Sequence, residues 1–183
     1  MPTVNFALVK NSFLKIAATL MAFAIAFSAA SSATAAPSPK PTSAKTSTSV
    51  KGPDGQTLTV SAFKNLAEGQ DVVVAGKGYN LKTGIYVTVC VVPPKGKKPE
   101  ICGAYDITGL NSQAVWVSSN PPLYAQLLVT PFGKGGTFKV TLPMKQIIHD
   151  NDCKLVRCAI LTRADHTNSA NRKADVIIPI TFK

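Results

Sequence analysis

The residues best suited to do chemistry in this chain are its four cysteines, which form two pairs. Cys90 and Cys102 bracket a turn-rich segment, and only four residues separate Cys153 from Cys158. Four cysteines allow three disulfide connectivities, and we favour 90–102 with 153–158 because both loops then close locally. Loops of these lengths would stabilise the fold by about 3 and about 2 kcal/mol in the chain-entropy model. Two disulfides indicate an oxidising compartment.

Metal binding and hydrolysis are the alternative chemistries, and the residues argue against both. Neither cysteine pair has the two-residue gap common in zinc sites, and His149 and His166 are the only histidines. His149 stands near Asp150 and Asp152, and His166 follows Asp165, but no nucleophile signature accompanies them. We interpret these clusters as turn caps. The sequence therefore predicts no enzyme activity, no catalytic residue, no metal and no cofactor.

The first 35 residues have the composition of a secretory signal peptide. Lys10 and Lys15 supply a positive start, an apolar run follows over 16–30, and Ala33-Thr34-Ala35 has the small-x-small cleavage pattern. We predict cleavage after Ala35. The apolar run is too short for a comfortable membrane span. The sequence therefore predicts a secreted or cell-envelope-associated protein.

Residues 36–56 are rich in Pro, Ser, Thr, Ala and Lys, and we predict a flexible spacer there, followed by one folded domain over 57–183. From Ala36 onward, eighteen Lys and Arg stand against nine Asp and Glu, a balance of +9. Such a charge favours an anionic cell-envelope polymer as a candidate partner. The chain has no run of five basic residues and few aromatic ones, so we expect no dedicated nucleic-acid surface. We also expect a monomer.

Short apolar runs between Gly, Pro and Asn indicate an all-β fold. Alternating or continuously apolar segments recur without a convincing amphipathic helix, apart from a short helical turn expected at 146–150. Pro179 would place the last strand at a sheet edge or a bulge. About seven strands at short intervals predict an antiparallel β-sandwich. The predicted strands lie at 58–62, 72–75, 85–92, 113–117, 137–142, 158–163 and 175–182.

The order of these elements resembles the neocarzinostatin family, the secreted actinobacterial apoproteins that carry enediyne chromophores. The resemblance covers 57–183 and is carried by the motifs Val-Ala-Gly-Lys-Gly-Tyr (74–79), Asp-Cys-x4-Cys (152–158) and Val-Ile-Ile-Pro-Ile-Thr-Phe (176–182), together with the first cysteine pair. It implies an immunoglobulin-like barrel of seven strands with a smaller two-ribbon side. It also implies an apolar cleft with the first disulfide on its floor, which holds a chromophore that cuts DNA.

Carried over by position, the resemblance places a set of residues beside that disulfide: Cys90, Cys102, Val92, Glu100, Ile107 and Arg163. The chain also departs from the pattern. Val92 stands where relatives have a bulky aromatic residue, Glu100 stands where they are apolar, and the chain is basic where the carriers are acidic. These departures favour a divergent exported relative over an enediyne carrier.

A longer segment, 103–136, has no counterpart of equal length and holds Trp116, Tyr124 and Phe132. Its rings predict either an aromatic-lined pocket or a loop that covers an exposed sheet edge. We therefore expect a secreted, non-catalytic binding module with a small apolar ligand in a cleft between its sheets. One alternative is an antibiotic apoprotein with a DNA-cleaving chromophore. The other is a basic protein that interacts with the cell envelope or surface.

Overall fold

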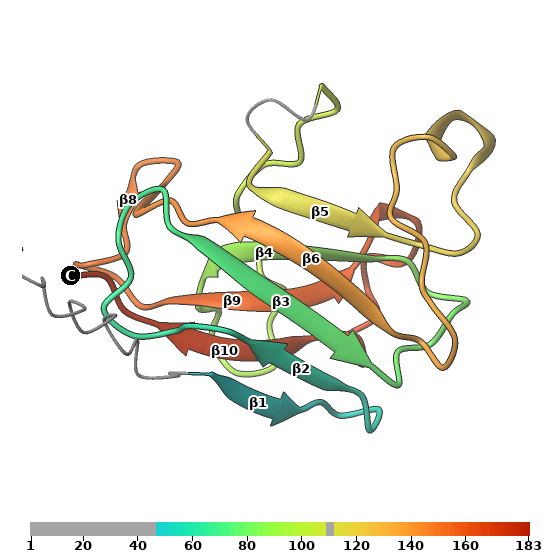
Figure 1. Cartoon of the computed structure of the whole chain (residues 1–183), viewed down its shortest axis with the longest axis horizontal. Coiled ribbons are helices and arrows are strands. Elements are labelled where there is room, and N and C mark those ends of the chain that lie inside the picture. The colour runs from blue at the N-terminus through green and yellow to red at the C-terminus, as the bar shows by residue number, and fades with distance from the viewer. Residues whose placement is uncertain (1–46, 109–111) are drawn as a thin grey trace, which may run out of the picture. The chain divides into compact units, whose positions relative to one another are not determined.

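The computed structural model describes residues 47–108 and 112–183, which form two four-stranded antiparallel sheets and one small hairpin (Figure 1). The predicted signal peptide and most of the predicted spacer lie outside these residues. The strands are β1 (Thr48–Lys51), β2 (Thr57–Val60), β3 (Asp71–Lys77), β4 (Ile85–Val91), β5 (Ala114–Val117), β6 (Phe138–Pro143), β7 (Ile147–Ile148), β8 (Asn151–Asp152), β9 (Cys158–Ala164) and β10 (Val176–Ile180). Two 3-10 turns, η1 (Leu123–Ala125) and η2 (His166–Asn168), complete the described elements. No helix in this part of the chain is long and apolar enough to cross a membrane.

The first sheet has the order β1-β2-β3-β6, and the second has the order β10-β9-β4-β5. In Figure 1 the two sheets lie as layers, with β3 and β6 over β4 and β9. This arrangement confirms the predicted all-β antiparallel sandwich, and each of the seven predicted strands is present. Pro179 lies in β10 at the edge of the second sheet, where a missing N–H costs no ladder bond.

The core lies between the sheets and is built by alternation along the strands. In β6 the buried residues Phe138, Val140 and Leu142 alternate with exposed Lys139 and Thr141, so one face packs and the other is solvated. The other strands add the fully buried side chains of Leu58, Val60, Val72, Val74, Val87 and Ile160. These side chains form one packed layer between the two sheets.

The strands β4 and β9 are apolar on both faces because both faces are covered. One face joins the core, and the other carries a smaller cluster of Cys90, Cys102 and Leu161, with Ile177 packed against it. The segment that follows Cys90 folds back over this outer face and pairs with β4 again, through Val91 N–H to Ile101 O at 2.9 Å. This cover explains why the apolar run at 85–92 does not alternate.

Both disulfides have the predicted local connectivity, Cys90–Cys102 and Cys153–Cys158. The two loops project from the same end of the second sheet, since β4 ends where its antiparallel partner β9 begins, with Val91 opposite Cys158. A hydrogen bond from Val92 N–H to Arg157 O, at 2.8 Å, joins the loops directly.

Two segments differ from expectation. Residues Thr48–Lys51 form β1 and pair with β2 along four residues, although they fall inside the predicted spacer, so the sheet begins before residue 57. Residues 146–150 are part of the β7–β8 hairpin rather than a helical turn. The hairpin turns at His149, which adopts a positive φ of 51°. This left-handed conformation reverses the chain sharply, as a tight turn requires.

One close backbone contact yields the first prediction. Gly136 has φ +66°, and a Cβ there would collide with the backbone carbonyl oxygen of Tyr79, whose N–H donates to Gly136 O at 3.2 Å. We expect Gly136→Ala to lower the free energy of unfolding by roughly 3 kcal/mol or more, because both the backbone conformation and the contact become strained. Urea unfolding followed by circular dichroism measures this change.

The matched control is Gly55→Ala. Gly55 also has positive φ, +85°, but has open space around the position of a Cβ, so only the conformational cost of about 1 kcal/mol remains. Equal losses in the two variants would show that the contact with Tyr79 contributes nothing.

Candidate functional site

A large hollow opens where the edge strands of the two sheets, β5 and β6, face each other. It has a volume of about 770 Å³, and we call it the β5–β6 pocket. Its walls come from β5, from the end of β6 and Lys145 beyond it, and from residues 105–108, 112–113 and 127–128 on either side of β5. The lining residues are Tyr105, Asp106, Ile107, Thr108, Ser112, Gln113, Ala114, Val115, Trp116, Leu127, Leu128, Thr141, Pro143 and Lys145. The hollow therefore lies at the edges of the two sheets, beside β5 and β6.

Trp116 forms a fixed wall of this pocket. It lies in β5, is 3% exposed, and donates from Nε1 to Asp165 Oδ2 at 2.9 Å. The other carboxylate oxygen of Asp165 accepts from Thr167 N–H at 3.0 Å and so caps η2. Gly84 leaves the space that this carboxylate occupies, because a Cβ there would collide with it. One buried carboxylate thus holds both the indole and the neighbouring turn.

Aromatic rings surround Trp116 on the outer face of the second sheet. Its ring centroid lies 5.8 Å from Tyr86, 6.1 Å from Tyr105 and 5.0 Å from His166. Tyr86 OH bonds to His166 Nδ1 at 2.7 Å, and Tyr124 OH bonds to His166 Nε2 at 2.9 Å. Since a neutral imidazole donates from one nitrogen and accepts at the other, one hydroxyl accepts and the other donates. Burial raises the pKa of Tyr86 to about 12, so this hydroxyl keeps its proton at neutral pH.

Tyr124 therefore links the tip of segment 103–136 to the second sheet and does not line the pocket. The same segment runs along the open edge of β5, where Ser118 N–H donates to Thr130 O at 3.0 Å and Thr130 N–H donates to Trp116 O at 2.9 Å. Phe132 is buried against Tyr79 and Phe138. The segment thus covers a sheet edge and also walls a hollow, which combines the two interpretations of its aromatic residues.

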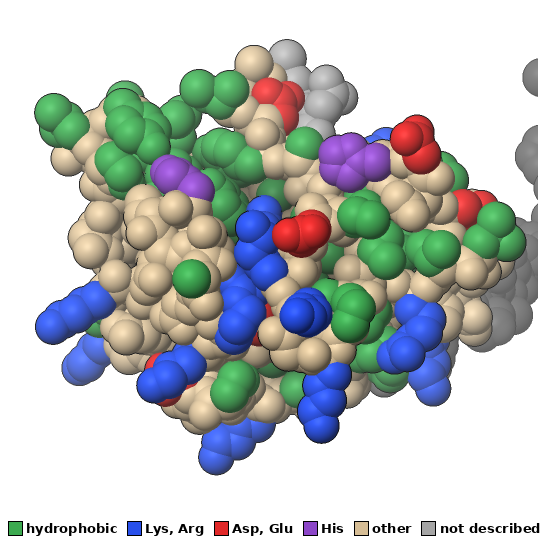
Figure 2. Space-filling view, turned by 180° about the vertical axis from the view of Figure 1, so that it is seen from behind, with side chains coloured by type: hydrophobic (Ala, Val, Ile, Leu, Met, Phe, Trp, Pro, Cys, Tyr) green, Lys and Arg blue, Asp and Glu red, His purple; other side chains and the backbone are tan. Residues whose placement is uncertain are grey.

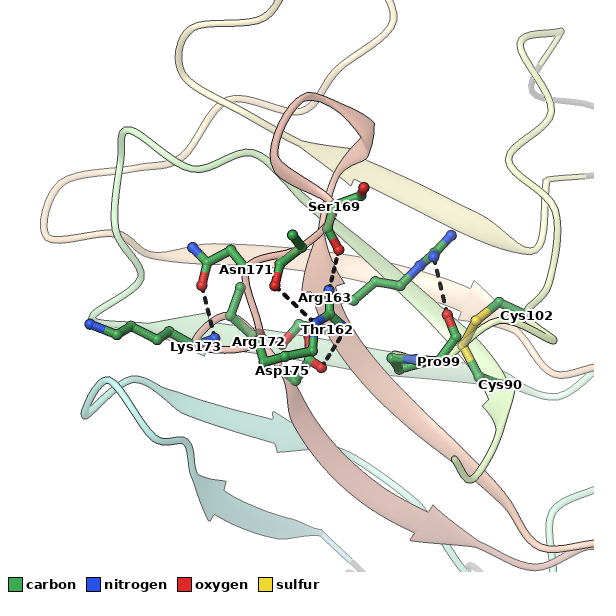
Figure 3. A network of polar contacts seen from close by, with 12 residues as sticks. Cys90, Pro99, Cys102, Thr162, Arg163, Ser169, Asn171, Arg172, Lys173 and Asp175 are labelled. Carbon is green, nitrogen blue, oxygen red and sulfur yellow. Dashed lines mark hydrogen bonds and ion pairs between the residues drawn. A yellow bond between two sulfur atoms is a disulfide. The ribbon is translucent and has the colours of Figure 1, made fainter. Parts of the chain in front are cut away.

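Arg163 lies on the outer face of β9, opposite Tyr86 of β4. Its guanidinium carbon stands 5.5 Å from the Tyr86 ring centroid, and Nη1 donates to Pro99 O at 3.2 Å, which bonds the first disulfide loop to the sheet (Figure 3). It lines a small hollow of about 260 Å³ together with Tyr86, Tyr105 and His166. Its bond to Pro99 O holds the loop against the sheet.

Val92 and Glu100 line a third hollow, of about 470 Å³, within the first disulfide loop. The residues predicted to bind a ligand, namely Val92, Glu100, Ile107, Trp116, Tyr124 and Arg163, are therefore distributed over separate places. Ile107 and Trp116 lie in the β5–β6 pocket, Arg163 lies in the small hollow, and Tyr124 lines none of the three. Cys90 and Cys102 lie beneath the loop, buried against Leu161.

Sequence reasoning missed Tyr105 and Leu127 as pocket residues. Tyr105 OH donates to Leu128 O, which bonds the start of the long segment to its middle. Leu127 is 99% exposed and yet lines the pocket. The sequence gives no signal for this residue, because an exposed leucine two residues after η1 belongs to no periodic pattern. Over the ranges 47–108 and 112–183, no three His, Cys, Asp or Glu side chains are grouped so that they could hold a metal ion.

A polar network behind Arg163 gives the second prediction (Figure 3). The Asp175 carboxylate accepts from Arg172 Nη1 at 2.7 Å, while its Oδ1 is buried with no partner in the described part of the chain. Burial outweighs the attraction of Arg172 and raises the pKa of Asp175 to about 6. Because the pKa of Asp175 is higher in the folded state than in the unfolded state, the native protein keeps this proton up to a higher pH. The stability that the protonated Asp175 contributes is therefore lost as the pH rises from about 4 to about 6.

We expect Asp175→Asn to remove this decline, since the amide cannot ionise. The free energy of unfolding of the variant relative to wild type should rise between pH 4 and pH 6 and stay level above pH 6.5, as measured by denaturant unfolding at each pH. A difference that falls over the same range would mean that the ion pair with Arg172 dominates.

Comparison with known proteins gives only distant likenesses. No family model matches the chain, and no curated protein matches its sequence. Among solved structures, the chain is similar to macromomycin, with a TM-score of 0.45 and 19% identity over 70% of this chain and 99% of that one. It is also similar to apokedarcidin, with a TM-score of 0.42 and 16% identity over 70% of this chain and 98% of the other. At these values we draw no argument about a ligand from either protein.

Proposed function

We propose that this protein is an exported, non-catalytic binding module that takes a small, largely apolar ligand in the β5–β6 pocket. The observation that carries the proposal is the combination of a hollow of about 770 Å³ with strongly exposed apolar side chains on its lining, Ile107 at 68% and Leu127 at 99%. A volume in this range suits a small organic molecule.

The exposed aliphatic side chains on the lining argue for a ligand, because such side chains gain free energy only when something covers them. A leucine or isoleucine that becomes buried contributes about 1.5–3 kcal/mol. Hydrophobic side chains gather on the protruding upper left part of Figure 2, the end of the molecule that holds the residues after β5. The Trp116 and Tyr105 rings supply flat surfaces at the back of the same pocket.

Polar groups on the lining suggest that the ligand also has a polar part. Lys145 lines the pocket and pairs with Glu68 through Nζ to Oε1 at 3.4 Å. Gln113 and Ser112 lie along another wall. We therefore expect a ligand with an apolar body and a few hydrogen-bonding groups, as is usual for small-molecule pockets.

The proposal that the module has no catalytic activity rests on the contacts of its cysteine and histidine side chains. The cysteines form disulfides, His166 bonds to two tyrosine hydroxyls, and His149 Nε2 bonds to Cys102 O at 3.0 Å. These contacts are structural. The disulfides also support export, because such bonds persist in oxidising compartments.

A neutral fluorescent probe, N-phenyl-1-naphthylamine, tests the proposal. Trp116 is the single tryptophan of the chain and lines the pocket, so a probe bound there should quench its emission by energy transfer and itself become brighter. We expect Leu127→Ser to weaken binding by roughly fivefold, the equivalent of about 1 kcal/mol of lost apolar contact. Ile107→Ser should act in the same direction.

Leu123→Ser is the matched control. Leu123 is 83% exposed on the same segment but does not line the pocket, so its loss should leave the titration unchanged. A probe that fails to quench Trp116, or that loses as much affinity in the control as in Leu127→Ser, would refute binding at this site. A bound compound that absorbs near-ultraviolet or visible light in protein from the native source would instead favour the antibiotic-carrier alternative.

A further inference from the structure

The two disulfide loops, residues 92–101 and 153–158, form a surface apart from the β5–β6 pocket. They emerge side by side because β4 and β9 are antiparallel neighbours, and the bond from Val92 N–H to Arg157 O fixes one loop against the other. Each loop is closed at its base by a disulfide. We call this surface the disulfide-loop platform.

The platform exposes apolar side chains to water, where they contribute no free energy of burial. Leu155 is 85% exposed at the tip of the shorter loop, and Ile101 is 40% exposed on the longer one. Between Val92 and Ile101, Pro93 and Pro94 complete a hollow of about 470 Å³ with largely apolar walls. A closed disulfide loop cannot withdraw these groups by refolding locally.

The same loops concentrate positive charge. They hold five cations, Lys95, Lys97, Lys98, Lys154 and Arg157, against one acid, Glu100. All six side chains are exposed, and none of them has an ion pair within the described residues. The rear face in Figure 2 shows basic side chains interspersed with hydrophobic ones.

We propose that the disulfide-loop platform docks on an anionic lipid bilayer. Leucine, isoleucine and proline groups would enter the headgroup boundary, and the lysines and arginine around them would face the lipid phosphates. Shallow apolar insertion and surrounding cations act together in interfacial binding, whereas either alone is weak. A soluble polyanion would use the cations but gives no reason for Leu155 to be exposed at the tip.

Flotation with vesicles tests this proposal. Protein secreted into the medium and kept oxidised is mixed with vesicles of equal parts phosphatidylglycerol and phosphatidylcholine, or of phosphatidylcholine alone. We expect it to float with the anionic vesicles and to be released by salt. Lys97→Gln with Lys98→Gln should lower partitioning at least about tenfold, since each cation near an anionic surface contributes appreciably. Leu155→Ser should lower it by roughly threefold.

Two further variants make the test specific. Lys134→Gln with Lys139→Gln removes the same charge from exposed positions elsewhere in the chain and should have little effect. Glu100→Gln removes the one acid of the platform and should raise partitioning by roughly threefold or more.

Several results would overturn the proposal. Equal losses in the two double-lysine variants would mean that net charge alone causes binding. Unchanged partitioning of Leu155→Ser, with equal binding to dextran sulfate, would indicate an acidic polymer as the partner. Failure of the wild-type protein to float with anionic vesicles would exclude docking altogether, while leaving the probe titration of the β5–β6 pocket unaffected.

Discussion

The ladder between β4 and β9 is the constraint on which the other features depend. Seven residue pairs, from Ile85 opposite Ala164 to Val91 opposite Cys158, join the two middle strands of the second sheet. Its inner face contributes Val87, Val89 and Ile160 to the sandwich core. Its end sets the two disulfide loops side by side. An antiparallel ladder fixes the register of every outward side chain, because a slip of one residue would turn the inner face outward.

The β5–β6 pocket and the two smaller hollows lie outside the sandwich core, because they form where other segments cover the outer face of the second sheet. The core between the sheets is packed with buried side chains, and the three recesses described above lie where added segments cover the second sheet incompletely. The first disulfide loop covers one end of this sheet, where Arg163 Nη1 donates to Pro99 O, and Thr130 bonds along the open edge of β5. The hollows are the spaces that these covers leave, and their walls combine rigid strands with loops. Binding residues commonly lie on loops that a rigid scaffold positions.

Much of the fold could be predicted from the sequence, because apolar periodicity and local cysteine spacing are local signals. Phe138, Val140 and Leu142 alternate as a half-buried strand must, and Cys153 and Cys158 are too close in sequence to require any distant partner. The strand β1 could not be found in this way, since Thr48–Lys51 has little apolar content and is held by pairing with β2. The arrangement of the candidate site residues could not be predicted in the same way. The neighbours of Arg163, Tyr124 and Glu100 depend on how the segments before and after β5 and the first disulfide loop fold back over the second sheet. Spacing along the chain does not encode that path.

Native-state hydrogen exchange measures the central claim most directly, namely that the β4–β9 ladder is the rigid base of the molecule. The amides of Val87, Val89, Ile160 and Leu161 should exchange only through global unfolding, with a free energy equal to that from denaturant unfolding. The amides of the tip around Leu123 should exchange much faster by local opening. Exchange of the ladder amides at rates close to those of the tip, with the disulfides intact, would contradict the account.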